Sequence, residues 1–118
     1  MTKHNQAIGR WGEDVAADYL IKKGYDIVDR NARTPYGELD LIMMHNGRLV
    51  IVEVKARTTA SYGYPETAIS TRKQEHLAAS AEHYAQEHNI DNWQIDAISV
   101  EGKPNRGEPR ITHFEDIL

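Results

Sequence analysis

The chain of 118 residues contains no cysteine, one phenylalanine and four prolines. The absence of cysteine excludes disulfide bonds and thiolate chemistry, and it fits a reducing compartment. No run of about 18 apolar residues occurs, so we expect no membrane-spanning helix. The first residues also lack the apolar segment of a secretory signal. Together these absences predict a cytoplasmic protein with no membrane partner.

Positive charge is scarce as well, because 14 lysines and arginines face 18 acidic residues, for a net charge of −4. This balance by itself argues against a nucleic-acid partner. The distribution is uneven, however. Residues 30–73 contain seven basic and four acidic side chains, a net charge of +3 that leaves −7 for the remainder. Any site for an anionic ligand is therefore expected in this middle segment.

A content of 40% hydrophobic and 27% charged residues is typical of a globular protein, and the length predicts a single domain over residues 1–118. Apolar spacing predicts helices over about residues 6–23 and 71–88. We expect Asn5 to cap the first helix, and Thr71 with Gln74 matches a capping box for the second. Strands are predicted over residues 25–30, 37–45, 48–57, 93–100 and 110–114. The order α-β-β-β-α-β-β predicts an α/β fold with a central mixed sheet flanked by helices.

The pair Asn46-Gly47 lies between two apolar runs and is typical of a two-residue hairpin turn. Counting outward from such a turn places Asp40 opposite Glu53, and Glu38 opposite Lys55, on one face of the hairpin. Two carboxylates in that relation repel each other. A divalent cation between them would convert the repulsion into binding energy, so the pattern indicates a metal-dependent site. A loop of three or five residues would spoil this register.

These residue types suit phosphodiester hydrolysis. Mg²⁺ (or Mn²⁺) takes a few carboxylates together with other oxygen ligands, here Asp40, Glu53 and the backbone carbonyl of Val54. Lys55 would stabilise developing negative charge or orient an attacking water. Glu13 on the first helix would add a carboxylate if that helix packs over the hairpin.

The ordered set resembles the PD-(D/E)xK nuclease core, and its layout is similar to that of archaeal Holliday-junction resolvases. More closely, the chain resembles the bacterial YraN-like family, which is assigned to the restriction-endonuclease-like fold. The matching stretches are Gly12-Glu13, Gly24-Tyr25, Arg30-Asn31, residues 37–42 (GELDLI), residues 52–57 (VEVKAR) and Lys73.

The resemblance implies a restriction-endonuclease-like α/β fold and a nuclease acting on DNA more than on RNA, including branched DNA. It implies metal ligation by Asp40 and Glu53, a catalytic role for Lys55 and an accessory role for Glu13. Lys73 would contact phosphate or aid catalysis. Resolvases act as pairs, so a homodimer is a further expectation.

Other interpretations stay open. The charges of the hairpin are also explained by a salt-bridge ladder, which stabilises a fold by about 0–1 kcal/mol. The chain would then be a catalytically weak or inactive module that binds nucleic acid or a protein partner. Arg57, Arg72 and Lys73 are placed to contact phosphate but also suit a solvated surface. Tyr62 and Tyr64 would either stack on bases or cover the edge of the core.

Overall fold

The computed structural model describes residues 3–58 and 70–118, and side chains from residue 6 onward. The elements are α1 (Lys3–Lys22), β1 (Asp26–Thr34), β2 (Gly37–His45), β3 (Arg48–Arg57), α3 (Thr71–Glu87), β4 (Trp93–Glu101) and β5 (Arg110–Phe114). The predicted order of helices and strands is thus confirmed. The predicted loop after Thr58, with Tyr62 and Tyr64, lies outside the described residues. No helix in the described ranges is long and apolar enough to cross a membrane.

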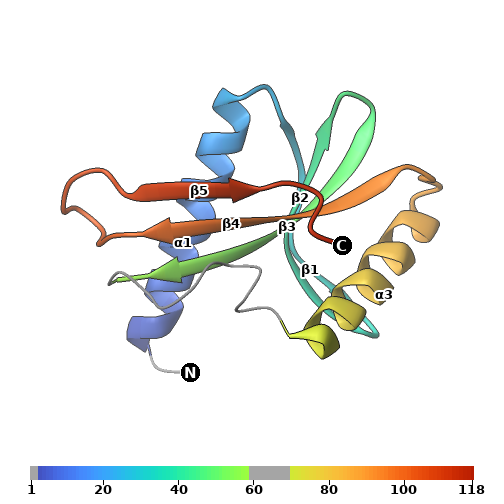
Figure 1. Cartoon of the computed structure of the whole chain (residues 1–118), viewed down its shortest axis with the longest axis horizontal. Coiled ribbons are helices and arrows are strands. Elements are labelled where there is room, and N and C mark those ends of the chain that lie inside the picture. The colour runs from blue at the N-terminus through green and yellow to red at the C-terminus, as the bar shows by residue number, and fades with distance from the viewer. Residues whose placement is uncertain (1–2, 59–69) are drawn as a thin grey trace.

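The five strands form one mixed sheet in the order β1-β2-β3-β4-β5. Strands β3 and β4 are parallel, and the other three neighbouring pairs are antiparallel. The parallel pair requires a crossover connection, which contains α3. Figure 1 shows α1 and α3 packed against different parts of the sheet. The predicted mixed sheet flanked by helices is therefore what the chain forms.

The residues of β3 alternate between two hydrophobic clusters, as a strand covered on both faces requires. Leu49 and Ile51 pack in the cluster that contains residues of α3, whereas Val50 and Val52 pack in the cluster that contains residues of α1. All four are buried, and burying such a side chain stabilises the fold by roughly 1.5–3 kcal/mol. The central strand therefore fixes one helix on each face of the sheet.

Helix α1 approaches β3 closely at Gly12. A Cβ atom at this position would overlap the Cβ of Ala56, and Val54 lies just beyond. Only glycine permits this approach without a shift of the helix. The contact brings the next residue, Glu13, over the end of the hairpin, as the sequence analysis required for a third carboxylate.

The hairpin turn is the predicted one. Asn46 and Gly47 both have positive φ, 52° and 77°, as a turn of this class needs. The predicted register is confirmed from the His45–Arg48 pair to the Leu41–Val52 pair. The ladder between β2 and β3 ends at that pair, so the expected Asp40–Glu53 opposition is not part of it. The expected Glu38–Lys55 opposition is not part of that ladder either. On the other side of β2, Glu38 pairs with Arg33 of β1, with 3.7 Å between Arg33 Nε and Glu38 Oε2.

Several boundaries differ from the predictions. Strand β1 continues to Thr34 because its second half pairs with the start of β2, and Asn31 adopts φ of 51° within it. Asn5 lies inside α1 and does not cap it. Helix α3 is capped by Ser70, one residue before the predicted cap, and the hydroxyl of Ser70 accepts a hydrogen bond from the N–H of Lys73 at 3.1 Å. The serine competes better for the cap because its hydroxyl reaches this free N–H.

Candidate active site

Asp40 lies where β2 changes the face to which its side chains turn. Leu39 packs in the cluster that contains α3 residues, but Leu41 and Met43 pack in the cluster that contains α1 residues. In a regular strand, residues 39 and 41 would share one face. The intervening Asp40 thus lies between the two layers, and it lines a cavity on each side.

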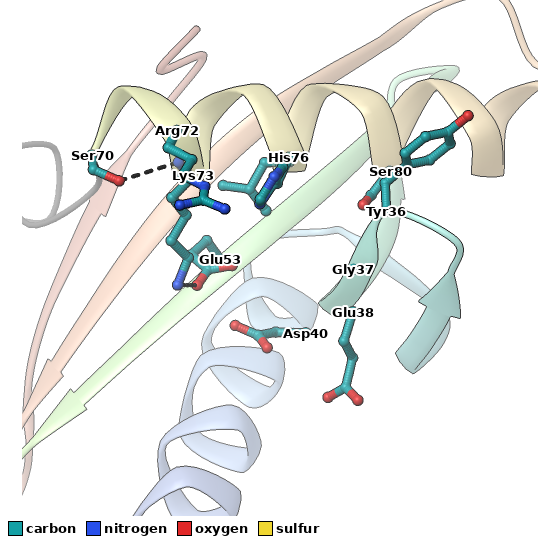
Figure 2. Close-up of a pocket in the computed structure, with 11 residues that line it drawn as sticks. Tyr36, Gly37, Glu38, Asp40, Glu53, Ser70, Arg72, Lys73, His76 and Ser80 are labelled. Atoms are coloured by element: carbon teal, nitrogen blue, oxygen red, sulfur yellow. Dashed lines mark hydrogen bonds and ion pairs between the residues drawn. The ribbon is translucent and has the colours of Figure 1, made fainter.

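The larger cavity has a volume of about 410 Å³ and lies along the first turns of α3. Figure 2 shows Asp40 and Glu53 entering it from the sheet, with Lys73 and Arg72 above them on the helix. The lining residues are Tyr36, Gly37, Glu38, Asp40, Glu53, Ser70, Arg72, Lys73, His76, Leu77 and Ser80. The cavity therefore brings together two predicted metal ligands and two predicted nucleic-acid contacts.

The half-buried carboxylate of Asp40 titrates far from its ordinary range. Burial, the charge of Glu53 and the charge of Glu13 raise the pKa of Asp40 to about 7, against the opposing hydrogen bond from Val54 and the charge of Lys73. The N–H of Val54 donates this bond to Asp40 Oδ2 at 2.9 Å. Val54 was expected to offer its carbonyl oxygen to a metal; the contact it makes here is through its N–H. Asp40 is thus an acid whose negative charge is poorly compensated.

Glu53 is compensated by a lysine that the hairpin pattern did not pair with it. Lys73 Nζ lies 2.8 Å from Glu53 Oε1, and the side chain of Glu53 is only 11% exposed. Burial lowers the pKa of Lys73, but the hydrogen bond and charge of Glu53, with the charge of Asp40, outweigh this and raise it. The cation facing the two carboxylates therefore comes from α3.

Glu13 approaches Asp40 from the other side, in a second cavity of about 360 Å³. Its Oε1 atom is buried without a hydrogen-bond partner among the described residues, although Arg30 Nη2 lies 3.6 Å away. A buried carboxylate oxygen in this state is costly. The carboxylates of Asp40, Glu53 and Glu13 offer hard oxygens of the kind that Mg²⁺ or Mn²⁺ prefers, but among the described residues these three do not bring their oxygens within 4.8 Å of one another.

The structure separates the remaining predicted residues. Lys55 is exposed and lines the second cavity with Glu13, not the first with Glu53. Arg57 is half-buried at the end of β3, aligned with Glu101 of β4. Arg72 is exposed at the start of α3 and lines the first cavity. Asp40 is the residue that both cavities share.

Three lining residues of the first cavity were not anticipated as site residues: Ser70, His76 and Tyr36. His76 lies one turn beyond Lys73, so helical spacing from Lys73 would have pointed to it. Tyr36 is 54% exposed, and its place is set by contacts in space. The hydroxyl of Thr34 accepts a hydrogen bond from the N–H of Tyr36 at 3.1 Å, and it donates one to Ser80 Oγ on α3 at 3.0 Å. No spacing in the sequence could have revealed that link.

A family model described as "Uncharacterised protein family UPF0102" matches residues 12–100. The chain belongs to this family. A UPF0102 protein of Syntrophotalea carbinolica is 42% identical over 97% of this chain and 93% of its own length. A UPF0102 protein of Dehalococcoides mccartyi is 36% identical over 100% of this chain and 98% of its own length. These findings are consistent with the YraN-like resemblance of the sequence. A solved structure, Pyrococcus furiosus SfsA in complex with Ca²⁺, has a TM-score of 0.41 at 16% identity, covering 94% of this chain and 63% of that one.

This member of UPF0102 has a second acidic cluster, which sequence reasoning missed. Ligand atoms of Asp96, His113 and Glu115 lie within 4.8 Å of one another, close enough to share a metal ion. Asp96 is already well satisfied, however. His113 Nε2 lies 2.7 Å from its Oδ2, and its Oδ1 accepts from Gln94 Nε2 at 2.8 Å and from the Asp116 N–H at 2.9 Å. A metal here would have to displace one of these contacts.

Proposed function

We propose that the chain is a metal-dependent nuclease that hydrolyses phosphodiester bonds in DNA or RNA, with DNA as the favoured candidate substrate, at the Asp40–Glu53 cavity. The observation that carries the proposal is that Asp40 and Glu53 line one open cavity with Arg72 and Lys73. In keeping with this, burial, Glu53 and Glu13 raise the pKa of Asp40 to about 7. Perturbed carboxylates that share an open cavity are typical of functional sites, because a core acid without a task is usually fully hydrogen-bonded.

Asp40 and Glu53 would hold Mg²⁺ or Mn²⁺, with Glu13 as an accessory ligand and the Val54 carbonyl as a further oxygen. When bound, such an ion polarises a phosphoryl oxygen and acidifies a water molecule. Lys55 and Lys73 flank Asp40 from the two cavities, so either ammonium can stabilise negative charge on the attacked phosphate. We give the position near the attacked phosphorus to Lys55, because the VEVKAR stretch resembles nuclease cores.

A nucleic-acid strand would lie along the first turns of α3. Arg72 and Lys73 line the cavity there, beside the N-terminus of a helix of 17 residues. Helix N-termini and basic side chains both favour phosphate. Arg57 would extend this contact from the end of β3. In keeping with the similarity to resolvases, we include branched DNA and a homodimer in the proposal.

The test is a cleavage assay with Mg²⁺ or Mn²⁺ on linear, single-stranded and branched DNA and on RNA. We expect Asp40→Asn to lose metal binding and cleavage together, and Lys55→Ala to lose cleavage by about 10²-fold or more while substrate binding persists. Asp14→Asn is the matched control, since Asp14 is an exposed acid on α1 that pairs with Arg30 at 2.8 Å. Full activity in purified Asp40→Asn or Lys55→Ala protein would refute the assigned roles.

One observation favours a second candidate, a non-enzymatic module. Lys73 already neutralises Glu53 at 2.8 Å, so half of the carboxylate pair is satisfied without a metal. Such a module would bind nucleic acid with an affinity that falls steeply with salt, and it would cleave none of the substrates. The same assay separates the two candidates, because binding and cleavage are scored on the same samples.

A further inference from the structure

We propose that Lys73 is a displaceable latch: its ammonium holds Glu53 in the metal-free protein, and a divalent cation competes for Glu53 and releases Lys73 toward substrate phosphate. This inference rests on the proposed function, because it takes Glu53 as a metal ligand. It goes further because it gives the Lys73 side chain two positions: on Glu53 in the metal-free protein, and toward substrate phosphate in the metal-bound protein. The probe cation is Mn²⁺ and the displaced group is a primary ammonium.

The ion pair between Lys73 and Glu53 joins one confined partner to one mobile partner, so it can break and re-form. The 2.8 Å ion pair joins a nearly buried carboxylate, 11% exposed, to a lysine side chain that is 48% exposed. A flexible four-carbon stem with one face in solvent can swing away at little cost. In Figure 2 the Lys73 side chain descends from α3 to Glu53, with Asp40 just below the pair. The nearly buried Glu53 has less freedom to move, because its backbone pairs with Ala97 of β4.

The backbone of Lys73 has a separate role that the latch does not disturb. Its N–H is bound by the capping hydroxyl of Ser70 at 3.1 Å. A change confined to the side chain therefore leaves the start of α3 intact, and Lys73→Met is expected to fold. Arg72 is the matched control. It is the neighbouring residue, it lines the same cavity, and it makes no ion pair within the described part of the chain.

The first experiment titrates Mn²⁺ by calorimetry into wild type, Lys73→Met, Lys73→Arg and Arg72→Met at pH 8.5, where proton competition for the carboxylates is weak. Lys73→Met should bind Mn²⁺ about tenfold more tightly, a difference of about 1.4 kcal/mol, because the competing cation is gone. Arg72→Met and Lys73→Arg should stay within about threefold of wild type. Equal affinities of wild type and Lys73→Met, or weaker binding by Lys73→Met, would overturn the latch.

The second experiment measures acylation of lysine side chains by mass spectrometry with and without Mn²⁺. The ion pair should protect Lys73 in the metal-free protein, and Mn²⁺ should increase its labelling several-fold while exposed Lys22 is unchanged. Labelling of Lys73 that does not rise at a saturating concentration of Mn²⁺ would contradict displacement, even if calorimetry shows tighter binding.

The two proposals can fail separately. If wild type binds Mn²⁺ and cleaves DNA but Lys73→Met shows no change in Mn²⁺ affinity, the nuclease stands and the latch is wrong. If only Lys73→Met binds Mn²⁺, Lys73 blocks the site permanently in wild type, and both the displaceable latch and the wild-type metal-dependent nuclease are wrong. If no variant binds Mn²⁺, the metal-dependent function and the latch are both wrong.

Discussion

Two carboxylates on the same sheet, Asp40 of β2 and Asp96 of β4, have pKa values that move in opposite directions. Burial raises both. For Asp96, hydrogen bonds from His113, the Asp116 N–H and Gln94 outweigh burial and hold the pKa below its usual value. For Asp40, the Val54 N–H opposes burial, while Glu53 and Glu13 add to it, so the pKa rises to about 7.

The difference separates an acid that holds the fold together from one that is available for chemistry. Asp96 fixes β5 through His113 and the segment after it through the Asp116 N–H. Within the described ranges Asp40 accepts one backbone hydrogen bond, and it faces two cavities. Burial alone therefore does not distinguish a functional acid; the number of donors that surround it does.

The largest effect should come from removing the satisfied acid. Asp96→Ala leaves His113, Gln94 and the Asp116 N–H without their acceptor, and we expect a loss of about 3–5 kcal/mol in the free energy of unfolding. Urea denaturation at pH 7 measures it. Because the pKa of Asp96 is lowered by folding, its stabilisation is present above the unfolded pKa of about 4 and is lost as pH falls through the folded value.

The exposed member of the same cluster supplies the control for that measurement. Glu115→Gln should change the free energy of unfolding by no more than about 0.5 kcal/mol. A large loss of unfolding free energy in Glu115→Gln would contradict this comparison. So would a melting temperature that rises with added Zn²⁺ only when Glu115 is intact, because the cluster would then be a metal site.

Removing the charge of Asp40, the poorly compensated acid, should raise the free energy of unfolding, whereas removing Asp96 lowers it. Folding raises the pKa of Asp40 from 3.8 to about 7, so the folded state binds the proton more tightly. The free energy of unfolding therefore falls as pH rises from about 4 to about 7. Asp40→Asn removes this loss and should be more stable than wild type by roughly 1–4 kcal/mol at pH 8, with a difference near zero at pH 4.

Denaturation of both proteins between pH 4 and pH 8, in EDTA, gives the difference curve. A flat curve would mean that Asp40 is not perturbed by folding. Saturating Mn²⁺ should reverse the order at pH 8, because only wild type gains stability from the bound ion. Asp40→Asn would then stabilise the metal-free fold and abolish the proposed activity. This combination is expected where a buried, poorly compensated charge is kept because the activity needs it.

The elements that local chemistry decides were predictable. Asn46-Gly47 sets its own turn through two positive φ values, and the register of the adjoining strands followed from it as far as Leu41–Val52. The order of elements followed from the period of the apolar residues in the same way. The convergence of Asp40 and Glu53 on one cavity was within reach because both lie a few residues from that turn.

The rest depends on contacts between distant segments. The Lys73–Glu53 pair requires α3 to cross β3 at one particular residue, and the Asp96–His113 contact requires β5 to align with β4 after an intervening loop. The extension of β1 past Arg30 was missed because pairing with β2 overrides the turn propensity of that segment. None of these contacts leaves a signature in sequence spacing.

The smallest effect tests how α1 contributes to the charge of Asp40. Glu13 is the weaker of the two acids that raise the pKa of Asp40, and it is held over the hairpin by the close packing of Gly12. Glu13→Gln should therefore lower the Asp40 pKa below about 7, as followed by ¹³C NMR titration of the Asp40 carboxyl carbon. Asp14→Asn removes the same charge one residue further on, where the side chain is 66% exposed, and should leave that titration where it is. If both substitutions shift the Asp40 pKa equally, the shift comes from the net charge of the helix, and it gives no support to Glu13 as a third ligand.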